Sequence, residues 1–168
     1  MNSSSAVPDE GVGDGCPACG GQVVLKPSTT AEHPCPHCGH RLWFLRKCVG
    51  DVVVITFLPG LTHRFESLQQ VDEVTKAVGR PRRLLLNLSH LRFVPSVFLG
   101  MLVELHRRMA SSPSVEVFGV EPESLRVFTA TRLDELFRIY DDEQSAFASL
   151  RPHPSRRFHP PIGKGLES

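Results

Sequence analysis

Two Cys-x-x-Cys pairs near the N-terminus constrain the fold of this 168-residue chain more than any other sequence feature. Each pair is followed by a glycine, and residues 20–34 separate the pairs. Pairs at this separation can place four thiolates tetrahedrally around one Zn²⁺ ion. The glycines allow the tight turns in which backbone N–H groups face the sulfurs. The sequence therefore predicts a structural zinc site, and its expected ligands are Cys16, Cys19, Cys35 and Cys38.

The cysteines predict a zinc ribbon over residues 16–45. A segment this short cannot bury a core of its own, so metal binding would supply its folding energy. Four cysteines fill the coordination sphere, which favours a structural or protein-contact role over a catalytic metal. We therefore expect the neighbouring His33, His37 and His40 to be exposed loop residues. Nucleic-acid binding is less favoured, because two basic and four acidic residues among 1–45 oppose contact with phosphate.

The composition is typical of a globular protein with one ordinary domain and a small attachment. Hydrophobic residues make up 40% of the chain and charged residues 22%, which allows a real core. The formal net charge of +1 gives no electrostatic footprint for nucleic acid or an anionic membrane. No apolar run approaches the ~18 residues of a membrane helix, and the N-terminus does not read as a secretory signal. We therefore expect a cytoplasmic protein with reduced thiols.

From Leu42 onward the pattern changes to strands, and after residue 60 strand patterns alternate with helix patterns. Strands are expected over 42–45, 52–58, 83–88, 115–119 and 136–139, and helices over 65–78, 97–110, 122–130 and 141–150. The alternation predicts an α/β domain over 46–150, with a mixed sheet of four or five strands. Residues 1–15 and 151–168 are polar or proline-rich and are expected to be disordered.

Ser96 stands where a buried strand, a loop and a helix meet. Serine is a preferred helix N-cap, worth ~1 kcal/mol relative to alanine. A phosphoryl group would also be stabilised at the N-terminus of a helix. The residues alone therefore leave two roles open for Ser96: it caps the helix, or it is modified there.

The helix after Ser96 has one face for the sheet and one that turns away. Phe98, Leu102, Leu105 and Met109 form the stripe expected to face the sheet, and Gly100 is expected to allow close packing. Residues expected on the outer face form a candidate partner-binding patch, unless the preceding loop or the ribbon covers them. These residues are Val97, Met101 and Glu104.

No catalytic constellation stands out. The sequence has no glycine-rich phosphate loop, and nothing indicates a base or oxyanion site for its serine and histidine pairs. We therefore do not expect an enzyme.

Residues 46–150 resemble a STAS domain, the family of the anti-sigma-factor antagonists. The resemblance rests on Leu84–Ser89, on Phe93–Ser96 with Leu99–Leu102, and on Val127–Tyr140. It implies a STAS-like mixed sheet and a regulatory role in transcription and signal transduction. By this resemblance, the phospho-acceptor falls on Ser96. The usual neighbours of that serine, an aspartate, a hydroxyl residue and a glycine, are Pro95, Val97 and Phe98 here.

The resemblance also implies partners. Antagonists of this family bind an anti-sigma-factor serine kinase when unphosphorylated and release it when phosphorylated, and a serine phosphatase resets the serine. The first hypothesis is therefore a protein-binding module switched at Ser96. The alternative is a scaffold or assembly protein that is not phosphorylated, and the least favoured is a nucleic-acid-binding ribbon protein.

Overall fold

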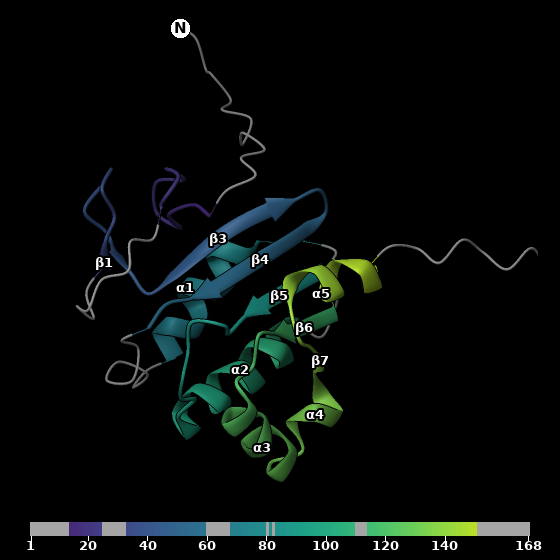
Figure 1. Ribbon diagram of the computed structural model, residues 1–168. Coiled ribbons are helices and arrows are strands. Elements are labelled where there is room, and N and C mark those ends of the chain that lie inside the picture. Colours follow the sequence, from purple (N-terminus) through teal and green to yellow (C-terminus); the bar gives the residue numbers. More distant parts are fainter. Residues whose placement is uncertain are drawn as a thin grey trace, which may run out of the picture.

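The computed structural model describes residues 14–24, 33–59, 68–79, 81, 83–109 and 114–150 (Figure 1). The disorder predicted for residues 1–13 and 151–168 lies outside the described residues, as does the start of the helix predicted from residue 65. Asp14 and Gly15, expected in the disordered N-terminus, form part of the ribbon.

The strands and helices follow the predicted order. The strands are β1 (His33–Pro34), β2 (Arg41–Leu42), β3 (Phe44–Val49), β4 (Val52–Phe57), β5 (Arg83–Asn87), β6 (Ser114–Phe118) and β7 (Arg138–Tyr140). The helices are α1 (Leu68–Val78), α2 (Ser96–Met109), α3 (Pro122–Ala130), α4 (Leu133–Leu136) and α5 (Glu143–Leu150).

Five strands form one mixed sheet in the order β3-β4-β5-β6-β7. Strands β3 and β4 are antiparallel and joined at Gly50, whose φ of 59° suits a tight turn. The pairs β4–β5, β5–β6 and β6–β7 are parallel. Parallel neighbours need long crossovers, and helices lie in each of them: α1, then α2, then α3 with α4. The predicted α/β fold with a mixed sheet is confirmed.

The sheet is covered on both faces. Helices α1 and α2 pack on one face, where Val74 and Leu102 join the main hydrophobic core. Helix α5 lies on the opposite face and buries Ala146 against Leu85 and Phe118 (Figure 1). Because both faces are covered, all six residues of β4 are buried.

Three details differ from the sequence expectations. Leu42 pairs with His33 in the small ribbon sheet instead of starting the hairpin, which begins at Phe44. The last strand starts at Arg138, because Leu133–Leu136 form the short helix α4, which follows Arg132 in the left-handed region (φ 57°). Gly100 faces outward, and a Cβ built on it would meet no atom within 4 Å, so its predicted role in close packing is wrong.

None of the helices in the described part of the chain is long and apolar enough to span a membrane.

Candidate functional site

The fold brings the four predicted ligand cysteines together. Their sulfur atoms all lie within 4.8 Å of one another. The Sγ atoms of Cys16 and Cys38 are 3.8 Å apart, as are those of Cys19 and Cys35. Four sulfurs bound tetrahedrally at ~2.3 Å from one Zn²⁺ would be separated by about 3.8 Å. The cluster therefore fits a tetrahedral thiolate-bound metal ion.

Backbone amides face the sulfurs. The N–H groups of Ala18, Gly21 and His37 each donate to a cysteine sulfur at 3.4 Å. Gly20 and Gly39 have φ values of 74° and 71°, the left-handed conformation that a residue with a Cβ rarely adopts. The predicted glycine turns are confirmed, and the amides they orient would stabilise negatively charged sulfur.

The Cys35 and Cys38 thiols differ in acidity when no metal is bound. Burial opposes ionisation of Cys35, but backbone N–H groups of Cys38 and His37 and the neighbouring thiols lower its pKa to about 6. The backbone N–H of His40 favours the Cys38 thiolate, yet burial and the three other sulfurs raise its pKa to about 12. A bound cation would favour the Cys38 thiolate, whose pKa the neighbouring sulfurs raise.

Among the described residues, the group that could hold a metal ion contains the four cysteines and neither His37 nor His40. The His37 side chain is exposed, as expected, and its Nε2 lies 3.1 Å from the Gln22 carbonyl of the other knuckle. His40 is half-buried, so the expectation of an exposed loop residue is wrong for it. Its Nε2 lies 3.3 Å from Glu73 Oε1 on α1. The His33 side chain lies outside the described residues.

The ribbon is attached to the sheet by backbone and apolar contacts. Gly15 and Arg46 exchange two backbone hydrogen bonds of 2.8 and 2.9 Å at the open side of edge strand β3. The two buried cysteines share a small hydrophobic cluster with residues of the ribbon and of the sheet domain. The cluster consists of Cys16, Val23, Cys35, Leu42, Leu45 and Leu58. The ribbon and the sheet domain therefore meet through a continuous core.

An ordered loop leads from β5 to Ser96. Asn87 Oδ1 accepts hydrogen bonds from the Ser89 N–H at 3.0 Å and from the Ser89 hydroxyl at 2.7 Å. Gly119, at the end of β6, lies against this turn, and a Cβ on it would be 2.8 Å from Ser89 Cβ. The start of the loop is thus held against the neighbouring strand.

Ser96 is the first residue of α2, and its side chain is exposed. The carbonyl of Pro95 accepts from the N–H groups of Phe98 at 2.9 Å and Leu99 at 3.2 Å, so Pro95 holds the N-cap position. Within the described residues the Ser96 hydroxyl makes no hydrogen bond. The interpretation of Ser96 as the helix cap is therefore wrong.

The predicted partner patch is only partly present. Val97 is exposed (54%), but Met101 is buried, because it lies three residues after Phe98 and four before Leu105 on the buried stripe. Its predicted outward orientation is wrong. Glu104 is half-buried, and its carboxylate accepts hydrogen bonds from Arg107 and Arg108, which lower its pKa to about 2.

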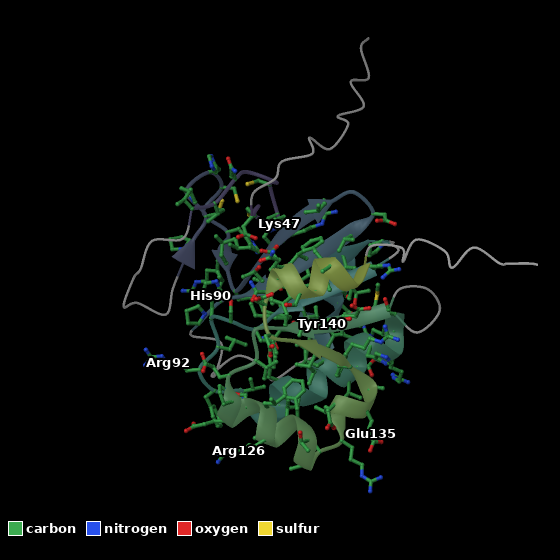
Figure 2. All side chains as sticks on the ribbon, turned by 45° about the vertical axis from the view of Figure 1, so that its right-hand side comes forward. Lys47, His90, Arg92, Arg126, Glu135 and Tyr140 are labelled. Carbon is green, nitrogen blue, oxygen red and sulfur yellow. The ribbon has the colours of Figure 1, made fainter. Side chains whose placement is uncertain are left out.

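Sequence reasoning missed the most exposed aromatic residue near Ser96. Phe93, in the loop expected to cover the patch, is 67% exposed. His90 and Arg92 in the same loop are also exposed, and Arg92 points away from the protein (Figure 2). We call Phe93 and Val97, on either side of Ser96, the serine-side patch.

A comparison with models of protein families identifies the family of the sheet domain. The STAS domain profile matches residues 50–146, which is more than half of the chain. The chain belongs to the STAS domain family. The STAS domain includes β5, the loop and α2, so both Ser96 and the serine-side patch lie within it. The cysteine cluster precedes the matched residues.

Several solved structures have a fold similar to that of this chain. A putative anti-sigma factor antagonist from Thermotoga maritima is 23% identical, with a TM-score of 0.53, over 65% of this chain and 95% of that chain. An anti-sigma factor antagonist from Mycobacterium paratuberculosis is 22% identical, with a TM-score of 0.54, over 65% of this chain and 93% of that chain. A STAS domain protein from Planctomyces limnophilus is 23% identical, with a TM-score of 0.56, over 65% of this chain and 98% of that chain. These similarities show the shared fold. Among curated proteins, no sequence match was found.

Proposed function

We propose that this chain is a regulatory protein-binding module, similar to an anti-sigma-factor antagonist, that is switched by phosphorylation of Ser96. The observation that carries the proposal is the Ser96 hydroxyl, which is exposed and free of hydrogen bonds within the described residues. Its other structural role, helix capping, is filled by Pro95. The two residues of the serine-side patch, Phe93 and Val97, are exposed apolar side chains that precede and follow Ser96 in the sequence.

A phosphoryl group at Ser96 would be stable and would change this surface. The N-terminus of α2 carries partial positive charge and N–H groups that favour an anion. Phosphate adds nearly two negative charges. A partner that buries Phe93 and Val97 would then have to desolvate that charge or meet it with its own acidic groups. The unmodified form binds the partner, and the phosphorylated form releases it.

The proposed partner is an anti-sigma-factor serine kinase, and a serine phosphatase restores the hydroxyl. Membership of the STAS family and the fold shared with two anti-sigma factor antagonists support these partners. The bulky residue in place of the family's glycine does not obstruct the surface, because Phe98 is fully buried. The partner surface is therefore the serine-side patch, without Met101 and Glu104. We propose binding and regulation as the role of the STAS domain, without catalysis of its own.

The switch is tested with the full-length chain and candidate serine kinases. After co-expression, mass spectrometry should find phosphate on Ser96, and pull-down should recover kinase with wild type and Ser96→Ala but not with Ser96→Asp. Ser114→Ala, at another exposed serine, is the matched control and should behave as wild type. Equal binding by all variants, with no phosphate on Ser96, would instead support a scaffold that is not phosphorylated.

We further propose that the cysteine cluster binds one structural Zn²⁺ and that the ribbon is a protein-contact module. The purified protein should contain one zinc per chain, and Cys35→Ser should lose it. Cys48→Ser is the control, because Cys48 lies on β3 outside the cluster. Protons compete with the metal for thiolates, and Cys38 without metal has a pKa raised to about 12, so zinc affinity should fall as the pH falls. Zinc retained by Cys35→Ser would contradict this site.

A further inference from the structure

One carboxylate on helix α1 holds two residues that follow the metal cluster. Glu73 Oε1 lies 3.3 Å from His40 Nε2, and Glu73 Oε2 accepts a hydrogen bond of 3.0 Å from Trp43 Nε1. His40 and Trp43 follow the ligand Cys38 by two and five residues. Both oxygens of Glu73 are therefore used by the segment that leads from the metal cluster into β3.

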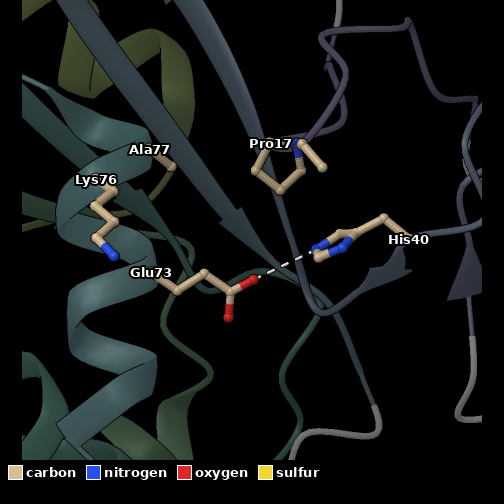
Figure 3. A pocket seen from close by; sticks show the side chains of 6 residues that line it. Pro17, His40, Glu73, Lys76 and Ala77 are labelled. Carbon is tan, nitrogen blue, oxygen red and sulfur yellow. Dashed lines mark ion pairs between the residues drawn. The ribbon is translucent and has the colours of Figure 1, made fainter.

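This contact crosses a space that side chains do not fill. A hollow of about 240 Å³ separates the first cysteine knuckle from α1 (Figure 3). Its lining residues are Pro17, Ala18, His40, Glu73, Lys76 and Ala77. Where this hollow lies, the first knuckle and α1 are not closely packed. The two polar contacts of Glu73 instead join α1 to His40 and Trp43, which follow the second knuckle.

The same segment leads inward toward the helix that carries Ser96. The Trp43 ring lies 6.1 Å from that of Phe57, and the Phe57 ring lies 5.0 Å from Phe98 in an edge-to-face contact. Phe98 is in the first turn of α2, two residues after Ser96. Helix α1 also contacts α2 directly, through the ion pair of Asp72 with Arg108.

We propose that Glu73 couples metal binding in the ribbon to helix α1, so that Zn²⁺ acts as an effector of the α1–α2 side of the STAS domain. With metal bound, the second knuckle holds His40 and Trp43 against Glu73 and fixes α1. Without metal, both contacts are lost and α1 is no longer held by the ribbon. This inference rests on the proposed zinc site, but it does not depend on phosphorylation of Ser96.

Coupling between two sites acts in both directions. If metal binding fixes α1 through Glu73, then the contact of Glu73 with the ribbon must in turn strengthen metal binding. Removal of the Glu73 carboxylate should therefore weaken metal binding. Typical coupling changes an affinity by about 5-fold to 150-fold. We expect Glu73→Ala to weaken zinc binding at least about fivefold. Glu73→Gln, which keeps one acceptor oxygen, should have a smaller effect.

The experiment uses the full chain, with zinc and after removal of zinc by a chelator. Zinc affinity is measured by competition with a chromophoric chelator for wild type, Glu73→Ala, Glu73→Gln and Asp72→Asn. Asp72 is the matched control, because its carboxylate is adjacent on α1 but contacts α2 instead of the ribbon. Amide hydrogen exchange reports on α1, and the fluorescence of Trp43, the single tryptophan, reports on its contact with Glu73.

The wild type should show slower exchange in α1 and a different tryptophan emission when zinc is bound, and Glu73→Ala should lose both effects. Asp72→Asn should bind zinc within about twofold of wild type. Suppose that one zinc binds per chain, but Glu73→Ala keeps wild-type zinc affinity and amide exchange in α1 is the same with and without zinc. The proposed coupling is then wrong, while the zinc site is supported. If no zinc binds, the zinc site and the coupling are both wrong.

Discussion

Gly119 occupies a position that other residues do not fit, because its φ of 72° and the nearness of Ser89 both exclude a Cβ. It ends β6 and holds the turn that begins the Ser96 loop. Gly100 is the opposite case. It lies within α2, exposed and without neighbours for an added Cβ. The helix therefore bears the conformational cost of a glycine without a packing benefit in the described structure.

The two glycines should respond to alanine in opposite directions. Gly100→Ala should raise the free energy of unfolding by about 1 kcal/mol, the difference in helix propensity. Gly119→Ala should lower it by about 2 kcal/mol, because alanine is strained at positive φ and would also push Ser89 away. Urea denaturation of both variants beside wild type measures the difference. A destabilised Gly100→Ala would contradict the exposed position of Gly100.

At the scale of elements, α2 has two different ends. Its first turn carries Ser96 and the exposed Val97, without acidic residues. Its last turns carry His106, Arg107 and Arg108, which suit the partial negative charge of a helix C-terminus. Glu104 binds both arginines from within the same helix. The basic end is therefore held by local ion pairs, and the first turn remains available for a partner or a phosphate.

The Glu104 ion pairs predict an acid dependence of stability. Hydrogen bonds from Arg107, then Arg108, lower the Glu104 pKa from 4.5 to about 2. A depressed pKa in the folded state contributes stability that is present above pH 4.5 and is lost as the pH falls toward 2. Glu104→Gln should therefore show a smaller loss of melting temperature between these two pH values than wild type. Equal losses in both proteins would show that solvent screens the pair completely.

The sequence predicted the elements well where residue patterns are long. The alternation of strands and helices and the helix after Ser96 are confirmed, with boundaries shifted by a few residues. It missed α4, because one turn of helix next to an apolar strand has no periodicity of its own. It misplaced Met101, because a helix that packs against both the sheet and α1 buries a wider stripe than one apolar face suggests. Ser96 was placed one position outside the helix, because Pro95 supplies the capping carbonyl.

At the scale of the whole molecule, the ribbon and the STAS domain form a joined structure. The sequence placed the four cysteines in one site, because their spacing determines the geometry that a metal requires. It gave no sign of the contact between Trp43 and Glu73, which are 30 positions apart. The contact of Leu45 with the buried cysteines Cys16 and Cys35 was not predicted either. An apolar pattern indicates that a residue is buried, but it does not identify the partner.

The shared core predicts that a cavity at Leu45 affects the cysteine cluster and the zinc proposed to bind there. Leu45 is fully buried, and Leu45→Ala should lower the free energy of unfolding by about 2–5 kcal/mol through the lost burial and the cavity. Because the cavity borders Cys16 and Cys35, zinc affinity without denaturant should also fall. Leu102→Ala is the matched control, since Leu102 is equally buried but belongs to the main core under α2.

This variant should lose a similar free energy of unfolding in urea, while the folded protein keeps its zinc affinity. Equal zinc affinity in both variants would mean that the ribbon binds metal independently of the core it shares with the STAS domain.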